Sequence, residues 1–137
     1  MANLFKENAV DDKKVKEGIW FDYDETCKFK LSMASSDEYK DALIDKQNQL
    51  AKRFRKGKIK TASQQHALAE VLTETIIKGW EGVEWGPKDK PLEFTKENCM
   101  MILKDKQAGL YIMEWILQNA GEKDEFLAFN IEDDSKN

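Results

Sequence analysis

The chain has 137 residues, of which 35% are charged and 41% hydrophobic, with a net charge of −4 at pH 7 and a mean hydropathy of −0.69. This composition excludes a membrane span, a collagen-like repeat and a small disulfide-stapled scaffold. The length fits one domain with a core of its own, since a chain of this size buries about 68% of its surface on folding.

The two ends of the chain are polar and differ in character from the middle. Residues 1–17 have weak periodicity, and we expect a flexible N-terminal arm there without the apolar stretch of a signal peptide. Residues 18–131 should form a single domain. The acidic residues 132–137 should be a disordered tail.

Residues 18–34 predict a β-hairpin. Alternate positions on both sides of residues 24–26 are apolar, and this period of two is typical of strands with one buried face. Two strands alone are marginally stable, so the apolar face must pack on helices. The apolar positions are Ile19, Phe21, Tyr23, Cys27, Phe29, Leu31 and Met33.

Two helices are expected next. Ser35 stands three residues before Glu38, a capping-box pattern, and the helix that follows should end near Gly57. A second helix is expected from about residues 61–63 to Lys78, ended by Gly79. The inward stripe of the first is Tyr39, Leu43, Leu50 and Phe54 with Ala42 and Ala51 beside it, and that of the second is Leu68, Val71, Leu72, Thr75 and Ile76.

The remaining elements predict an α+β fold that is mostly helical, with the N-terminal β-hairpin packed on four to five helices. Residues 79–94 combine Gly and Pro with large apolar side chains and predict a structured loop. Thr95 should cap a third helix that buries Cys99, Ile102 and Leu103. A fourth helix from Gln107 to Ala120 should turn Leu110, Met113, Ile116 and Leu117 inward, and residues 122–129 should add a turn or two.

Charge is distributed unevenly along the chain. Residues 35–60 carry a net charge of +4 and residues 61–137 carry −7, and the run 52–60 holds Lys and Arg without any acid. Such a run can attract nucleic acid, or it can complement the negative end of a helix dipole, and we favour the second interpretation. We also expect the basic segment of one subunit to meet the acidic region of the next, in a head-to-tail contact.

Catalytic and metal-binding patterns are missing from the sequence, so we predict no enzyme, no metal and no cofactor. Phosphate-cradle, nucleophile-elbow and zinc-protease motifs are absent. The single histidine, His66, has Glu70 four residues on, which is more often an exposed pair than a general base. Cys27 and Cys99 lack metal-ligand spacing and should be reduced thiols.

The four tryptophans are many for so polar a chain, and Trp is the residue most enriched at interface hot spots. They either contact a partner or cover the edges of the core. We take as candidate protein-binding residues Trp20, Trp80, Trp85 and Trp115, with Arg53 and Arg55 as electrostatic contacts.

The order of several short motifs resembles the tail assembly chaperones of long-tailed phages with non-contractile tails. The motifs are residues 18–24 (GIWFDYD), 29–31 (FKL), Tyr39, 78–83 (KGWEGV) and 91–98 (PLEFTKEN). The resemblance spans about residues 17–130. One departure is residues 33–35 (MAS), where such families have Ala-Arg, so a basic contact is not expected there.

The resemblance implies a role in assembly. Such chaperones coat the tape measure protein, keep it soluble, help recruit the tail tube protein and form oligomers. They act in the host cytoplasm and are absent from the mature virion. They occur as a short form and a frameshifted longer form, and this chain resembles the short one. The alternatives are a small nucleic-acid-binding protein that uses residues 52–60 and another phage structural or connector protein.

Overall fold

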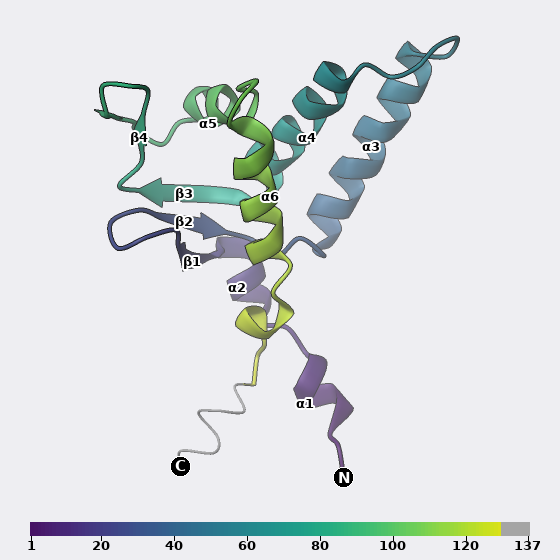
Figure 1. Ribbon diagram of the computed structural model, residues 1–137. Helices are drawn as coiled ribbons and strands as arrows, with labels where there is room; N and C mark the ends of the chain where they lie inside the picture. Colours follow the sequence, from purple (N-terminus) through teal and green to yellow (C-terminus); the bar gives the residue numbers. More distant parts are fainter. Residues whose placement is uncertain (130–137) are drawn as a thin grey trace.

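The computed structural model describes residues 1–129 and has an α+β fold (Figure 1). The N-terminal part contains the short helices α1 (Leu4–Asn8) and α2 (Asp12–Glu17), then strands β1 (Ile19–Asp22) and β2 (Lys28–Leu31). The middle contains helices α3 (Asp37–Arg53) and α4 (Thr61–Thr75) and strand β3 (Ile77–Glu81). The last part contains β4 (Glu84–Trp85), β5 (Lys90–Pro91), α5 (Lys96–Leu103), α6 (Gly109–Ala120) and the 3-10 helix η1 (Lys123–Phe126).

The predicted hairpin is confirmed. Strands β1 and β2 pair antiparallel, with Ile19 opposite Leu31 and Asp22 opposite Lys28. Phe29 and Leu31 are buried and Trp20 lies on the other face of the strand, as the alternation predicts. One face of the sheet therefore belongs to the core.

A third strand corrects the prediction for residues 76–81. Helix α4 ends at Thr75 rather than near Lys78, and β3 pairs antiparallel with β2, which becomes the central strand. Gly79 lies within β3 and does not stop a helix. Ile77, the first residue of β3, is β-branched and fits a strand, and the edge of β2 supplies backbone partners that the sequence does not reveal.

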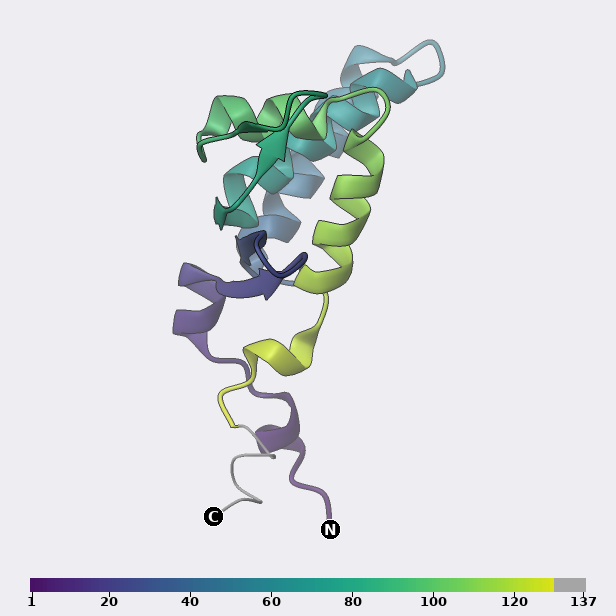
Figure 2. The ribbon, with the colours of Figure 1, turned by 60° about the vertical axis from the view of Figure 1, so that its left-hand side comes forward.

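The core lies between this sheet and helices α4, α5 and α6. Helix α6 runs across the sheet, while α3 and α4 form an antiparallel helical hairpin that projects to one side (Figures 1 and 2). Thr95 caps α5 through Asn98 N at 3.0 Å, as predicted. Fully buried side chains include Leu31, Leu72, Ile76, Ile102, Ile116 and Phe126.

Two details of the helices differ from the prediction. Ser36, not Ser35, caps α3, by accepting from Tyr39 N at 3.2 Å, so the capping box with Glu38 does not form. Leu110 is 52% exposed although it was predicted to face inward, because it lies in the first turn of α6, at the margin of the core. Met113 and Ile116 are buried as predicted.

The N-terminal region differs from the expected arm. Asp11 N donates to Phe126 O at 2.8 Å, and Ala128 N donates to Ala9 O at 2.9 Å, so the chain on both sides of Val10 pairs with the segment after η1. Ser32 Oγ donates to Val15 O at 2.5 Å. Residues 9–17 are thus part of the folded unit. The predicted acidic tail, residues 132–137, lies outside the described residues.

Within residues 1–129, no helix combines the length and the apolar character that a bilayer crossing needs.

Candidate partner-binding surfaces

An apolar groove of about 350 Å³ opens on the surface between the β1–β2 turn, the segment from β3 to β4 and helix α6. This size lies at the lower end of the range of about 300–1,000 Å³ found for ligand pockets, so the groove can hold a few side chains but not a whole helix. We call it the aromatic groove. Its apolar lining consists mainly of Tyr23, Phe29, Val83, Trp85, Ile112 and Trp115.

The turn between β1 and β2 gives the groove one rigid wall. Asp24 Oδ1 accepts from Thr26 N at 2.8 Å and from Cys27 N at 2.7 Å, which fixes the turn. The backbone hydrogen bond from Thr26, followed by that from Cys27, lowers the pKa of the Asp24 carboxyl. The carboxylate therefore remains charged, and a second acidic residue, Glu84, also lines the groove.

Aromatic contacts join the groove to the core. The Trp115 ring lies 5.4 Å from that of Phe29 and 5.3 Å from that of Tyr23, centroid to centroid. Phe29 in turn contacts Trp80 at 5.8 Å, and Trp80 contacts Phe94 at 5.0 Å. The Trp115–Phe29 pair is tilted by 54°, and the other three pairs are edge-to-face. Aromatic pairs of this kind hold rings in defined orientations, so the groove is preformed.

The structure separates the four candidate tryptophans. Trp85 and Trp115 are half-buried, and both line the aromatic groove. Trp80 is only 6% exposed, and its Nε1 donates to Leu92 O at 2.8 Å. Its side chain therefore belongs to the core and is removed from the candidate contact surface, because it has almost no area to offer a partner.

Trp20 is 42% exposed on the opposite face of the sheet. The Nζ atom of Lys28 lies 4.8 Å from its ring centroid and that of Lys30 lies 6.0 Å away. These cation–π contacts cover part of the ring. Trp20 thus forms a site of its own, outside the aromatic groove.

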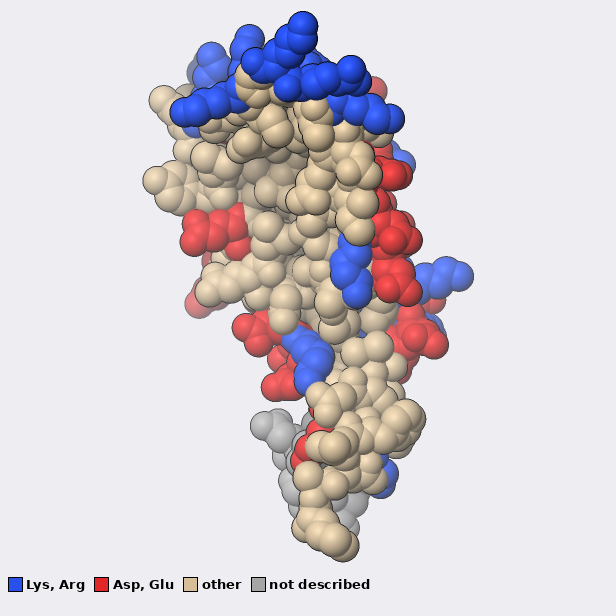
Figure 3. Space-filling view, turned by 90° about the vertical axis from the view of Figure 1, so that its right-hand side faces the viewer, with Lys and Arg blue, Asp and Glu red and all other residues tan. Residues whose placement is uncertain are grey.

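Arg53 and Arg55 lie in a basic turn, defined here as Lys52, Arg53, Arg55, Lys56, Lys58 and Lys60, all of which are exposed. The basic turn covers the last residues of α3 and the connection from α3 to α4. Figure 3 shows Lys and Arg side chains gathered over this end of the molecule, with acidic side chains along the sides below it. The basic turn is not part of the aromatic groove.

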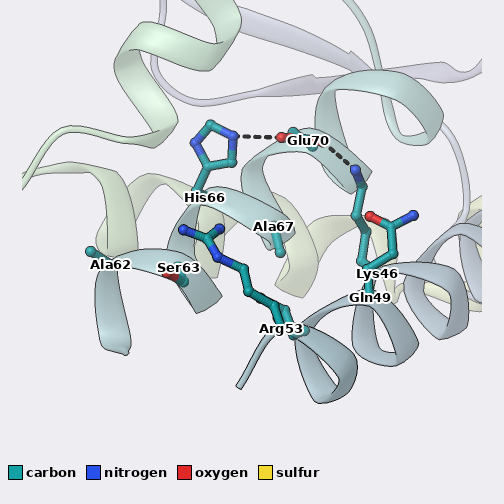
Figure 4. Close-up of a pocket in the computed structure, with 9 residues that line it drawn as sticks. Lys46, Gln49, Arg53, Ala62, Ser63, His66, Ala67 and Glu70 are labelled. Carbon is teal, nitrogen blue, oxygen red and sulfur yellow. Dashed lines mark hydrogen bonds and ion pairs between the residues drawn. The ribbon is translucent and has the colours of Figure 1, made fainter. Parts of the chain in front are cut away.

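A polar hollow of about 390 Å³ lies between α3 and α4 (Figure 4). Its centre is Glu70, which pairs with Lys46 Nζ from α3 and with His66 Nε2 at 2.5 Å from its own helix. The hydrogen bond from Lys46 is the largest cause that lowers the pKa of the Glu70 carboxyl. Held between two basic groups, the carboxylate connects the two helices.

The environments of the two cysteine thiols lower their reactivity. Cys99 is fully buried, and this burial raises its pKa to about 11. Cys27 is half-buried in the lining of the aromatic groove, and burial raises its pKa as well. Neither forms a disulfide. Within residues 1–129, no group of three His, Cys, Asp or Glu side chains could hold a metal ion.

Sequence reasoning did not identify Tyr23, Cys27 and Ile112 as parts of a binding surface. The alternation of the hairpin placed Tyr23 and Cys27 on the apolar face, which was the available signal. The groove is built from three segments far apart in the chain, so no local pattern reveals it.

The model of one protein family, described as YdaY prophage protein, matches residues 34–137. The match covers α3 to the end of the chain and leaves out the hairpin, so it includes Trp85 and Trp115 but not Tyr23. No curated protein and no solved structure shows significant similarity to the chain.

Proposed function

The chain belongs to the YdaY prophage protein family, and on this basis we propose that it is a phage tail assembly chaperone. In this role it binds the tape measure protein, keeps it soluble and helps recruit the tail tube protein. It acts in the host cytoplasm, leaves before the virion matures, and works by binding rather than by catalysis. The order of motifs in residues 17–130, from the hairpin to residues 91–98, supports this assignment beyond the prophage family itself.

The aromatic groove is the observation that carries the proposal. An amphipathic helix presents apolar side chains at positions i, i+3, i+4 and i+7, and a short groove with aromatic walls can take two or three of them. Trp85 and Trp115 provide large, rigid contact surfaces. Repeated weak capture of this kind suits a long client that must be held soluble and then released.

The acidic rim suggests how the client is oriented. Asp24 and Glu84 line the groove beside its apolar floor. Basic residues that flank the apolar stripe of a client helix would face these carboxylates, which favours one direction of approach. The free energy of binding still comes mainly from apolar contact, so it should depend little on salt.

The test is coexpression with a tape measure protein from the same prophage. We expect the wild-type chain to keep the client in the soluble fraction and Trp85→Ala to reduce the soluble client severalfold. Trp20→Ala is the matched control, because Trp20 is also a surface tryptophan but lies on the opposite face of the sheet. Equal client solubility with both variants would contradict the proposed groove.

Cys27 offers a direct readout of the same site. It is half-buried in the groove, whereas Cys99 is fully buried. Bound client should slow alkylation of Cys27 in the folded protein and leave the total of two thiols unchanged after unfolding. Alkylation at an unchanged rate in the presence of soluble client would show that the client binds elsewhere.

Nucleic acid binding is the second candidate, favoured by the basic turn at one end of the molecule (Figure 3). Contacts to phosphate make the affinity for nucleic acid fall steeply as the salt concentration rises. The slope of log affinity against log salt is proportional to the number of these contacts. Binding to random-sequence DNA or RNA at 50 and 200 mM salt distinguishes this function. Tight, strongly salt-dependent binding that is lost in the double variant Arg53→Glu, Arg55→Glu would support it over the chaperone.

A further inference from the structure

Helix α3 has an outer face made of exposed residues. Its inner face packs on α4 through half-buried residues, including Tyr39, Leu43 and Leu50, and none of its residues is fully buried. At 100° per residue, the opposite side is a seam of exposed residues. The seam consists of Asp37, Asp41, Ile44, Asn48, Ala51 and, in the turn after the helix, Arg55.

The spacing along this seam is alternately four and three residues. This is the spacing by which two helices pack side by side over several turns. Ile44 lies at the middle of the seam and is 54% exposed, so it offers apolar surface to a second helix. The seam therefore has the geometry of a helix–helix contact.

Charge is polarised along the same face. The first turn carries Asp37 and Glu38, whereas the far end carries Lys52 and Arg55. If α3 of a second copy runs antiparallel to this helix, the charges of the two faces are complementary. A copy in the same direction would place acid against acid and base against base.

We infer that two copies of the chain associate through α3 in an antiparallel arrangement, with the twofold axis level with Lys46. In this register Asp37 lies opposite Arg55 of the second copy, and Ile44 lies opposite Asn48 of the second copy. Along one flank, Glu38 faces Lys52 of the second copy. Each pair occurs twice, so the contact is isologous and closes as a dimer, unlike the head-to-tail contact expected from segment charges.

One approach in this dimer is unfavourable. Asp45 lies on the outer side of α3 next to Ile44, and it faces Asp45 of the second copy across the axis. Like charges placed directly opposite weaken a helix pair. Removal of this charge should therefore strengthen the dimer.

The association should be weak and sensitive to salt. The ion pairs are exposed, and Ile44 is the one large aliphatic side chain on the seam, so we expect dimers to form at low salt and high protein concentration. The Debye length falls from about 30 Å at 10 mM salt to about 3 Å at 1 M, which should shift the protein to monomers.

Sedimentation velocity of two charge-reversed variants tests the arrangement. Asp37→Lys with Glu38→Lys makes both ends of the seam basic, and Lys52→Glu with Arg55→Glu makes both ends acidic. Each variant alone should bind itself at least tenfold more weakly than the wild type. An equimolar mixture should restore dimers, because the two variants are complementary to each other; recovery in the mixture also shows that both are folded.

Two further variants sharpen the test. Lys56→Glu with Lys58→Glu changes net charge as much as the second variant but lies beyond the seam, so it should dimerise like the wild type. Asp45→Asn should tighten the dimer severalfold. A wild type that is monomeric at 1 mM protein and 10 mM salt overturns the inference, as does a mixture that stays monomeric. Salt-dependent DNA binding by a monomer, lost in the Lys52 and Arg55 variant, would assign these cations to nucleic acid instead.

Discussion

Single residues decide the shape of the aromatic groove, and Gly82 is the clearest case. It has a φ of +71°, and a Cβ atom built there would lie 1.9 Å from Thr26 O. The chain after β3 can therefore approach the β1–β2 turn only where the side chain is a hydrogen atom. Because Thr26 and Gly82 both line the groove, this close approach sets the distance between its two walls.

We predict that Gly82→Ala destabilises the protein by at least about 3 kcal/mol, as the sum of left-handed backbone strain and a displaced turn. Gly86→Ala is the matched control, because Gly86 has a φ of +89° but no atom within 4 Å of an added Cβ. It should cost about 1–2 kcal/mol. Urea unfolding measures both changes, and equal values would mean that the close approach to Thr26 is not maintained in solution.

At the scale of elements, the ion pair between α3 and α4 connects a helix that has no fully buried residue to the rest of the fold. Lys46 comes from α3, and Glu70 comes from α4. The pair is partly shielded, with side-chain exposures of 24% and 28%. It adds a specific contact to the modest apolar packing of α3, so loss of it should affect the position of that helix most.

This pair makes stability depend on pH in the acid range. The pKa of Glu70 is lower in the folded protein than its ordinary value of 4.5, so its contribution is complete above that value and is lost as pH falls through the folded pKa. Glu70→Gln should cost on the order of 1 kcal/mol at pH 7 and remove that part of the acid dependence. Glu74→Gln changes an exposed residue of the same helix. It should leave the stability at pH 7 and its dependence on acid pH unchanged.

Urea unfolding between about pH 3 and pH 7 checks this prediction. The difference in stability between the wild type and Glu70→Gln should shrink as the pH falls below 4.5. A difference that stays constant over this range would mean that the side chain contributes through packing and not through its charge.

Elements with a local signal could be predicted from the sequence. The period of two around residues 24–26 predicted the hairpin, and Thr95 predicted the start of α5, because a strand face and an N-cap are properties of a few neighbouring residues. Strand β3 was missed because its partner β2 lies almost fifty residues away in the chain. Ile76 and Ile77 continue the apolar character of α4, so their periodicity could not separate a helix from a strand.

The same limit applies to the candidate site. Residue type identified Trp85 and Trp115 as contact candidates, and the structure brings them together in one groove. Residue type alone could not exclude Trp80, whose burial depends on the carbonyl of Leu92 and on the ring of Phe94. A tryptophan in a polar chain can thus be a contact or a core residue, and tertiary packing decides which it is.

For the whole molecule, the arrangement places the two proposed contact surfaces on separate parts of the fold. The aromatic groove is built from the hairpin turn, the segment from β3 to β4, and α6. Helix α3 packs mainly on α4 and projects away from the sheet (Figure 1). A dimer formed through α3 would therefore carry two open grooves, and a client longer than one groove could contact both, which raises the effective concentration for the second contact.

This separation predicts that client binding and self-association are independent at the level of one subunit. Trp85→Ala should weaken client binding and leave the dimer dissociation constant within about twofold of the wild type, since distant sites act additively. The Lys52 and Arg55 double reversal should weaken the dimer at least tenfold but leave the affinity of one groove for a short client peptide unchanged. Its affinity for a long client should fall, because the second groove is no longer linked to the first. Calorimetric titration of both variants with a short and with a long segment of the client measures the affinity for each segment. An equal loss of affinity for both lengths in the Lys52 and Arg55 variant would mean that the groove and α3 are coupled through the fold.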